Sequence, residues 1–461
     1  MFIFKVYSKE QHEKLVIVIV VFIVINARNS ELFLFSIVTG KQNYTTEKKS
    51  EFTFYIVYYG FIMYQPSPEL LKKYADVLVK FALRGGEGVK QGDVVFVQIP
   101  ECAKPFYLPL QKSILEAGAH PIFEYYPDGV SRHFYEHAAD EQITFYPEHF
   151  LHGKVQQMTH VISVIAEADK YELKGVDPQK MAARVSSRKP YIEKRTQKEL
   201  EGKMTWTLGL YGTPAMAEEV GMSLEEYRKQ IINACYLDEE KPIEHWKKVN
   251  EEIETIITKL NTIKIQKVHM VGQDVDLWVG IGSDRKWLGG SGRNIPSFEI
   301  FTSPDYRQTS GWMKFNQPLY RYGQKITGIS LKFEKGEVIE FDAQEGKDLL
   351  TEIFEISGTK SLGEFSLTDG RHSRITKAMG ETLYDENMGG PFGNTHVAIG
   401  RAYEETYTGD VSSLSAEQRK ELGFNQSAEH IDIISTTDRT VTAYLEDGSE
   451  KIIYQDGKFI I

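Results

Sequence analysis

The sequence predicts an α/β N-terminal domain with an open, largely parallel sheet, followed by a β-rich α+β C-terminal domain. At 461 residues the chain is longer than one ordinary hydrophobic core organises. Between residues 93 and 126 a strand, a helix and a second strand follow one another, which is the pattern of a parallel βαβ unit. Beyond about residue 265, short alternating segments separated by Gly-containing turns replace that pattern and indicate antiparallel sheet.

The first 62 residues read as an atypical N-terminal extension. Residues 15–25 (LVIVIVVFIVI) are intensely apolar, but this run is too short for a helix that must cross a bilayer with about 20 residues. The run has the length of a signal-peptide core, so a secreted or membrane-anchored protein is the alternative. We expect instead that Met63 is the working start, that residues 1–62 are poorly ordered or precede the true start, and that the protein is cytoplasmic without stable membrane association.

The predicted α/β domain covers residues 63–265. Ser67-Pro68 marks a helix start, because Ser is a favoured N-cap and Pro suits the first helical position. The predicted strands and the helices between them then follow in order: strands 93–100, 120–126, 159–166 and 204–212, with helices at 108–118, about 177–202 and 215–262.

The predicted β-rich catalytic domain covers residues 266–461. Its segments are joined by turns in which Gly permits the positive φ of a tight hairpin. These turns are Glu334-Lys335-Gly336-Glu337, Glu446-Asp447-Gly448-Ser449 and Gln455-Asp456-Gly457-Lys458.

Composition excludes several classes of protein. The net charge of −11 leaves no basic surface for nucleic acid. Cys102 and Cys235 are the only cysteines, which excludes a disulfide framework and a Cys-based zinc site and fits a reducing compartment.

One short motif offers an alternative zinc-peptidase site. His133, Glu136 and His137 fit H-x-x-E-H, in which two His share a helix face and Glu acts as base. A three-letter pattern arises readily by chance in a chain with 12 His, so we favour a solvated helix face. The Gly-rich run 287–296 is interpreted as an irregular loop, because no helix follows it to make a phosphate cradle.

The stronger constellation of chemical groups begins with the segment AEHIDIIS. In a strand, His430 and Asp432 point to the same face, and two polar groups held there must be hydrogen-bonded, paired or bound to a metal. Glu299, Glu364 and His396 lie in other apolar, strand-like segments, and the nearest cationic residues in these segments are few (Arg293 and Arg401). A mixed set of carboxylate and imidazole groups without sulfur suits two divalent cations such as Zn, Co or Mn.

The same segments carry a family resemblance. GRNIPSFEIFT, LGEFSL, DEN…THVAIGRAY and HIDIIS resemble the aminopeptidase T family of thermophilic-type dinuclear metallo-aminopeptidases, and the likeness extends over most of residues 63–461. The resemblance implies two divalent metal ions per chain (Zn, Co or Mn, with Mg possible), a homodimer and short peptide substrates. It places the metal ligands on Glu299, Glu364, His396, His430 and Asp432, and the catalytic Tyr on Tyr403. The chain departs from the pattern where DENMGGPFGNTH inserts a longer Gly-rich loop at 388–394.

The function expected from these residues is hydrolysis of the first peptide bond by a water that bridges two metals. Either Glu299 or Glu364 is expected to bridge the ions. The free amine of the substrate is expected to bind a metal or a nearby acid such as Asp385 or Glu386. Tyr403 is expected to donate a hydrogen bond to the tetrahedral oxyanion. The alternative from another class is a non-catalytic peptide-binding protein of the same fold.

Overall fold

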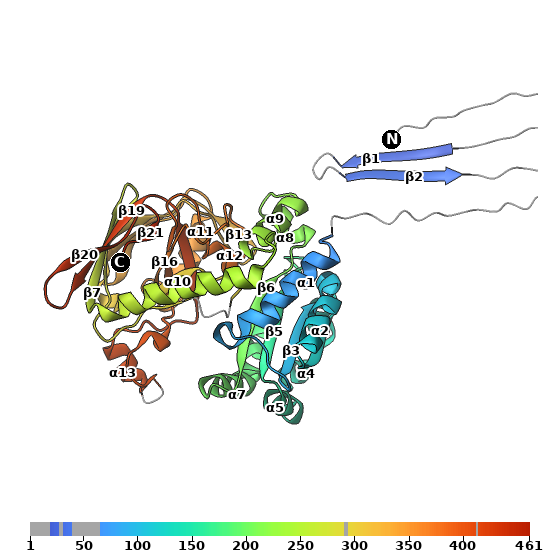
Figure 1. The fold of residues 1–461 in the computed structure, drawn as a ribbon, viewed down its shortest axis with the longest axis horizontal. Helices are drawn as coiled ribbons and strands as arrows, with labels where there is room; N and C mark the ends of the chain where they lie inside the picture. The colour runs from blue at the N-terminus through green and yellow to red at the C-terminus, as the bar shows by residue number, and fades with distance from the viewer. Residues whose placement is uncertain (1–18, 27–30, 39–64, 290–293, 412–413) are drawn as a thin grey trace, which may run out of the picture. The chain divides into compact units, whose positions relative to one another are not determined.

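The computed structural model describes residues 19–26, 31–38, 65–289, 294–411 and 414–461. The expected start at Met63 and most of the extension lie outside the described residues. In the N-terminal unit the backbones of β1 (Ile19–Asn26) and β2 (Glu31–Val38) pair antiparallel (Figure 1). Pro66–Ile461 forms a second unit, to which the rest of the description applies. Among the described residues, no helix combines the length and apolarity needed to cross a membrane.

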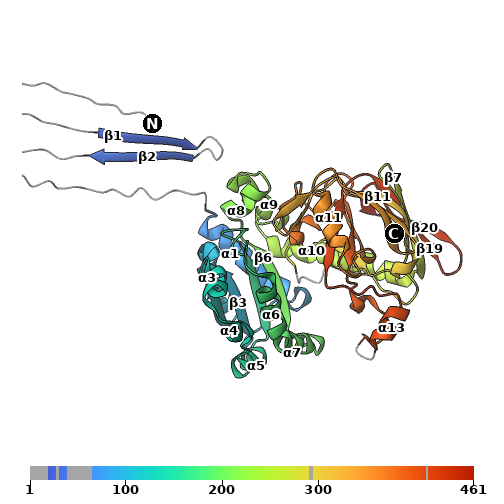
Figure 2. The same cartoon turned by 180° about the vertical axis from the view of Figure 1, so that it is seen from behind.

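A four-stranded parallel sheet forms the first part of the larger unit, as predicted. Its spatial order is β4-β3-β5-β6, and every neighbouring pair is parallel. Its strands are β3 (Val94–Pro100), β4 (His120–Tyr126), β5 (His160–Ile165) and β6 (Thr205–Leu210). Helices lie on both sides of this sheet, with α1 (Pro68–Val77) towards the viewer in Figure 1 and α6 (Pro178–Ser187) in Figure 2.

The helices begin where the sequence chemistry places them, but they are more divided than predicted. Ser67 caps α1 by accepting the Leu70 N–H at 3.1 Å. The helix predicted at 215–262 is three helices, because Ser223 caps a new start and Pro242 occupies the first position of another. Lys189-Pro190 likewise divides 177–202. The remaining helices of this part are α2 (Tyr107–Glu116), α3 (Val130–His137), α4 (Asp140–Thr144), α5 (Glu148–Gln157), α7 (Lys189–Leu200), α8 (Pro214–Glu219), α9 (Leu224–Ala234) and α10 (Pro242–Thr262).

An eight-stranded antiparallel sheet follows, in the order β15-β14-β11-β8-β7-β19-β20-β21. Two of its hairpins have the predicted tight turns: φ is +51° at Lys335 and +88° at Gly336, and +49° at Asp456 and +73° at Gly457. Its strands are β7 (Ile265–Gly272), β8 (Val275–Gly280), β11 (Ser310–Lys314), β14 (Ser330–Glu334), β15 (Glu337–Asp342), β19 (Arg439–Leu445), β20 (Glu450–Gln455) and β21 (Lys458–Phe459). The smaller elements nearby are β12 (Leu319–Arg321), β13 (Gln324–Ile326), α11 (Lys347–Phe354), α12 (Thr382–Asp385) and α13 (Ala416–Glu421).

A second antiparallel sheet of five strands holds the predicted ligands. Its order is β18-β17-β16-β10-β9, so strands far apart in the sequence become neighbours. Every residue of β16 and β17 is buried, including the polar side chains of Glu364 and His396. The strands are β9 (Leu288–Gly289), β10 (Glu299–Thr302), β16 (Leu362–Thr368), β17 (Asn394–Gly400) and β18 (His430–Ser435).

Trp246 of α10 joins the parallel-sheet part to the strand that carries Glu299. The indole is 2% exposed and stacks on Phe298 with ring centroids 5.2 Å apart and an angle of 8°. It also stacks on Phe81 at 5.9 Å, and its Nε1–H donates to the Cys235 carbonyl at 3.1 Å. Because Phe298 directly precedes Glu299, this contact helps to fix the start of β10.

Replacing Trp246 by Ala is expected to lower the free energy of unfolding by about 3–5 kcal/mol, because a large buried ring is lost and a cavity remains. Urea unfolding followed by circular dichroism measures this change. W246F keeps most of the packed volume and serves as the control, with a smaller loss expected. A W246A protein that unfolds at the wild-type urea concentration would contradict the packing role.

Candidate metal centre

One face of the five-stranded sheet gathers acid and imidazole side chains through its register. Glu364 of β16 lies opposite Ala398 of β17, which lies opposite Asp432 of β18. Residues directly opposite one another in neighbouring strands point to the same face of the sheet. The two carboxylates therefore project from one face, and the small Ala398 between them leaves the space above it open.

The other three residues join the same face by the same rule. His396 lies opposite Ser366, two positions along β16 from Glu364, and His430 lies opposite Gly400. Glu299 of β10 pairs with Thr368, two further positions along β16. Alternation along each strand therefore points all five side chains in one direction.

The five side chains converge into a ligand cluster (Glu299, Glu364, His396, His430 and Asp432). His396 Nε2 lies 2.9 Å from Glu364 Oε1, 3.3 Å from Glu299 Oε2 and 3.8 Å from Asp432 Oδ1. His430 Nε2 lies 3.4 Å from Asp432 Oδ1 and 3.7 Å from Glu364 Oε2. The structure thus brings together every residue that the sequence nominated as a ligand.

The ligand cluster divides into two overlapping groups of three. Glu299, Glu364 and His396 have one ligand atom each within 4.8 Å of one another, and so do Glu364, His430 and Asp432. Glu364 belongs to both groups, and a carboxylate has two oxygens to share. This arrangement matches a pair of neighbouring cation sites joined by one carboxylate.

Hydrogen bonding orients the imidazole of His430. Its Nδ1–H donates to the Arg401 carbonyl at 2.7 Å, so the opposite nitrogen, Nε2, is the one that faces the carboxylates. His396 is fully buried, and its Nε2 faces Glu364 and Glu299. Both rings therefore present Nε2 to the same space.

The electrostatics of the ligand cluster favour bound cations. Burial, together with the charge of Glu299, raises the pKa of Glu364 to about 7. Burial alone would lower the pKa of His430, but Asp432 and Glu364 outweigh it and raise this pKa to about 9. In the part of the chain that the structure describes, no Lys or Arg forms an ion pair with these five residues. Buried carboxylates that lack a basic partner are stabilised by divalent ions, and carboxylate with imidazole suits Zn, Co or Mn.

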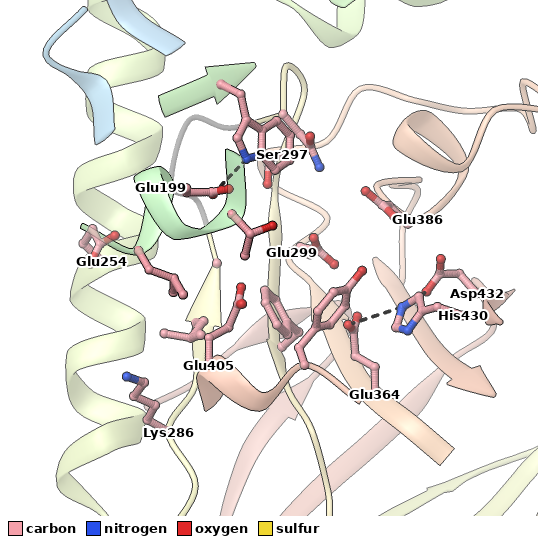
Figure 3. Close-up of a pocket in the computed structure, with 18 residues that line it drawn as sticks. Glu199, Glu254, Lys286, Ser297, Glu299, Glu364, Glu386, Glu405, His430 and Asp432 are labelled. Atoms are coloured by element: carbon pink, nitrogen blue, oxygen red, sulfur yellow. Dashed lines mark hydrogen bonds and ion pairs between the residues drawn. The ribbon is translucent and has the colours of Figure 1, made fainter. Parts of the chain in front are cut away.

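Four residues of the ligand cluster, all except His396, line a cavity of about 750 Å³ (Figure 3). Glu386 and Tyr403 line the cavity beside the ligands. Other acids line it as well: Glu199 from α7, Glu254 from α10, and Glu405. Lys286 is the only Lys among the described lining residues, and Figure 3 shows it on the opposite side from His430 and Asp432.

Tyr403 lies directly above the ligand cluster. Its ring centroid is 4.6 Å from that of His430, and its other side meets Phe301 edge-on at 5.7 Å. Burial raises the pKa of Tyr403, and the neighbouring carboxylates of Glu364 and Asp432 raise it further. The phenol therefore stays protonated and can donate a hydrogen bond into the cavity.

The structure gives different positions to Asp385 and Glu386, the two acids that the sequence suggested for binding the substrate amine. The Asp385 carboxylate accepts the N–H groups of Met379 at 2.5 Å and Gly380 at 3.0 Å, so it closes a turn instead of facing the cavity. Glu386 does line the cavity. Burial and the charges of Glu299 and Asp432 raise the pKa of Glu386 well above its ordinary value. Because the two acids are adjacent in the sequence, the sequence alone did not show which of them faces the cavity.

The H-x-x-E-H motif lies on the exposed face of α3. Glu136 pairs with Arg132 of its own helix at 2.7 Å, and the rings of His133 and His137 stack with centroids 4.3 Å apart. Among the described residues the motif forms no group of three ligand atoms. It therefore has the environment of a solvated helix face. Residues 290–293 of the Gly-rich run, including Arg293, lie outside the described residues.

Comparisons with known proteins agree on one family. The family model described as thermophilic metalloprotease (M29) matches residues 67–459. Aminopeptidase T of Thermus thermophilus is 26% identical over 419 residues, covering 85% of this chain and 100% of its own. Aminopeptidase 2 of Geobacillus stearothermophilus is also 26% identical, over 84% of this chain and 97% of its own, and aminopeptidase AmpS of Bacillus subtilis is 27% identical over 82% and 97%.

A solved structure has the same fold. Wild-type AmpT from Thermus thermophilus superposes with a TM-score of 0.73 at 24% identity, covering 85% of this chain and 99% of that chain. The likeness confirms the predicted combination of a parallel α/β sheet with a β-rich region.

Removing the shared carboxylate should affect both cation sites, whereas removing an unshared one should affect only one. With one ion in each ligand group, which is the occupancy that we propose below, E364Q is expected to lose both ions and E299Q to keep one, because Gln preserves size but not charge. Elemental analysis of protein dialysed against Zn²⁺ and then against buffer measures the content per chain. E136Q, in the exposed motif of α3, is the control and should bind as the wild type does. Full metal content in E364Q would contradict the shared role.

Proposed function

Because the chain belongs to the M29 family of thermophilic metalloproteases and is a metal-dependent aminopeptidase, we propose that it removes the N-terminal residue of short peptides at the ligand cluster. The observation that carries this proposal is the pair of overlapping ligand groups that share Glu364 and open into one cavity. As an enzyme of this family, the chain is not the non-catalytic binding protein considered as an alternative.

Two divalent ions are proposed to bind, with Glu299 and His396 holding one, His430 and Asp432 the other, and Glu364 between them. Zn, Co or Mn fits this donor set, and Mg is compatible with its carboxylates. Such a pair would supply an activated water between the ions and a Lewis acid for the scissile carbonyl. The five side chains are held by four neighbouring strands before any ion binds. Binding therefore requires little loss of side-chain conformational entropy.

Tyr403 is proposed to stabilise the oxyanion that forms when the scissile carbonyl is attacked. Its phenol is held between Phe301 and His430 and remains protonated, so it is a ready donor beside the ligand cluster. Preorganised donors of this kind act where charge develops in the transition state.

Glu386 is proposed to bind the free α-amine of the substrate. It is buried, lines the cavity and lies close enough to Glu299 and Asp432 for their charges to raise its pKa. An ammonium group at that point would relieve this crowding of negative charge. An amine site beside the ligand cluster accounts for cleavage at the first peptide bond rather than within a chain.

The assembly and setting of the enzyme follow as further proposals. A cavity of about 750 Å³ suits short peptides.

The resemblance to the aminopeptidase T family implies a homodimer, and the exposed apolar residues Leu108 and Leu115 of α2, beside the edge strand β4, offer a face for a second copy. The free thiols of Cys102 and Cys235 suit a cytoplasmic location.

H430A is expected to lower the release of p-nitroaniline from Leu-p-nitroanilide by more than about 100-fold. The loss is large because His430 is proposed to bind a metal ion itself, and not merely to hydrogen-bond to a residue that does. The assay uses the full chain with Co²⁺ or Zn²⁺, and a chelator should stop the wild-type reaction. H133A is the matched control and should keep wild-type activity, since His133 lies on the exposed helix α3. The opposite pattern would transfer the activity to the H-x-x-E-H motif.

Y403F is expected to lower kcat by about 10²- to 10³-fold while metal content stays unchanged, because Phe keeps the ring packing and removes only the donor. Steady-state kinetics on the same substrate, with metal analysis of the same preparation, measures both quantities. A Y403F enzyme with wild-type kcat would exclude the phenol from oxyanion stabilisation.

A further inference from the structure

Asn387 links two parts of the active site through one fully buried side chain. It is 0% exposed. Its Oδ1 accepts the Phe298 N–H at 2.6 Å, and its Nδ2 donates to the Leu383 carbonyl at 3.1 Å and to Glu386 Oε1 at 3.3 Å. Phe298 is the residue before Glu299. A single amide group therefore connects the backbone that begins β10 to the carboxylate of Glu386.

We propose that Asn387 is a positioning residue that fixes the carboxylates of Glu386 and Glu299 relative to one another, an inference that rests on the proposed amine-binding role of Glu386. Misplacement of a catalytic group by about 1 Å can cost 10²-fold in rate. The substrate amine and the ligand Glu299 must be held in a constant relation if the first peptide bond is to lie over the ligand cluster. The side chain of Asn387 joins the Glu386 carboxylate to the backbone N–H of Phe298, the residue before Glu299.

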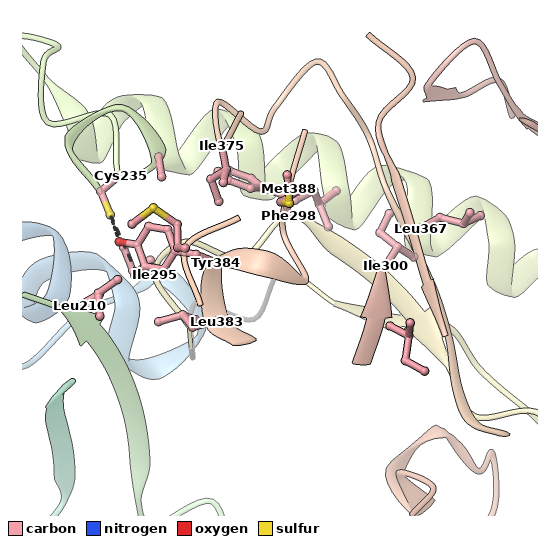
Figure 4. Close-up of a cluster of buried hydrophobic side chains, with 14 of the residues drawn as sticks. Leu210, Cys235, Ile295, Phe298, Ile300, Leu367, Ile375, Leu383, Tyr384 and Met388 are labelled. Atoms are coloured by element: carbon pink, nitrogen blue, oxygen red, sulfur yellow. Dashed lines mark hydrogen bonds between the residues drawn. The ribbon is translucent and has the colours of Figure 1, made fainter. Parts of the chain in front are cut away.

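Groups other than the Asn387 side chain hold the backbone around this residue, so the local fold does not depend on that side chain. Leu383, Tyr384 and Met388 are buried on either side of it in the hydrophobic core, part of which Figure 4 shows. Asn394 Nδ2 donates to the Glu386 carbonyl at 2.7 Å. These contacts remain when the side chain of Asn387 is changed, so a variant at this position should still fold.

The longer Gly-rich loop begins after Asn387 and ends before Asn394. Within it, Gly393 has φ of +59°, and a Cβ at this position would collide with the Thr368 carbonyl and the Tyr454 hydroxyl. Tyr454 Oη lies 2.9 Å from the Thr368 carbonyl at the end of β16 and 3.1 Å from the Phe392 carbonyl of the loop, so it holds this part of the loop beside β16. The insertion is therefore accommodated between the two asparagines, and the residues that place Glu386 stay outside it.

The chemistry of the position favours Asn over Asp. An aspartate would still accept the Phe298 N–H, but it would lose both donated hydrogen bonds. It would also place a negative charge beside the carboxylate of Glu386, in a site that already contains several acids. The amide is the group of this size that accepts on one side and donates on the other.

A double-mutant cycle tests the proposal with the metal-loaded full chain and Leu-p-nitroanilide. N387A should lower kcat/KM by about 10- to 100-fold, the loss expected for a hydrogen bond to a charged group, while metal content is unchanged. In the E386Q background the same change should cost less than about threefold, because a residue that acts through Glu386 has little left to position. S373A, which removes a hydroxyl that donates to the Asn387 carbonyl, is the matched control and should keep wild-type kcat/KM.

N387D provides the second variant if N387A does not fold. In the wild-type background, N387D should also lower kcat/KM by about tenfold. In the E386Q background it should lower kcat/KM hardly at all, because the amide introduced by E386Q can donate to the new carboxylate. Equal losses in both backgrounds, or wild-type kcat/KM in folded N387A or N387D, would overturn the positioning role. Wild-type protein without activity on any peptide would instead overturn the proposed function, which separates the two failures.

Discussion

The burial of Glu364 between two imidazoles is the constraint on which the site depends. This carboxylate is 3% exposed and has His396 within 2.9 Å and His430 within 3.7 Å, with further acids close by. Grouping several carboxylates away from water is costly unless positive charge compensates them. The fold meets this requirement by fixing the side chains on adjacent strands, where they cannot separate to relieve repulsion, and so maintains a space that attracts divalent ions.

The sequence could predict which side chains of a strand share a face, but it could not predict which strands pair with one another. The spacing of His430 and Asp432 sufficed to place both on one face of β18, and the resemblance to a family supplied the other ligands. The order β18-β17-β16-β10 brings Glu299 and His430, more than a hundred residues apart, into one sheet, and it depends on long-range packing that no local pattern records. For the same reason Asp385 and Glu386 were equivalent in sequence, although one closes a turn and the other lines the cavity. Asn387 carried no signal, because its importance lies in contacts with Phe298 and Glu386.

The helical part of the larger unit contributes to the site as well as to stability. α7 and α10 supply Glu199 and Glu254 to the cavity wall, and Trp246 of α10 stacks on Phe298 next to Glu299. The predicted strands of this part were found within about two residues, since buried parallel strands have continuous apolar sequences. Its helices were less predictable, because Ser223 and Pro242 begin new helices within the stretch that was predicted as one helix.

The absence of a Lys or Arg partner for the ligand cluster, in the described part of the chain, has a functional meaning. An Arg placed beside Glu364 and Asp432 would compensate their charge with bidentate hydrogen bonds, and the fold could be equally stable. Such a pair would occupy the oxygen lone pairs that a metal needs. Lys286 lies across the cavity instead, and the ligand cluster keeps its acid oxygens and the Nε2 atoms of both imidazoles directed at one another. The sheet thus accepts a local electrostatic cost and leaves these oxygen and nitrogen atoms available to a metal, which is the condition for the metal-dependent hydrolysis that we propose at this face.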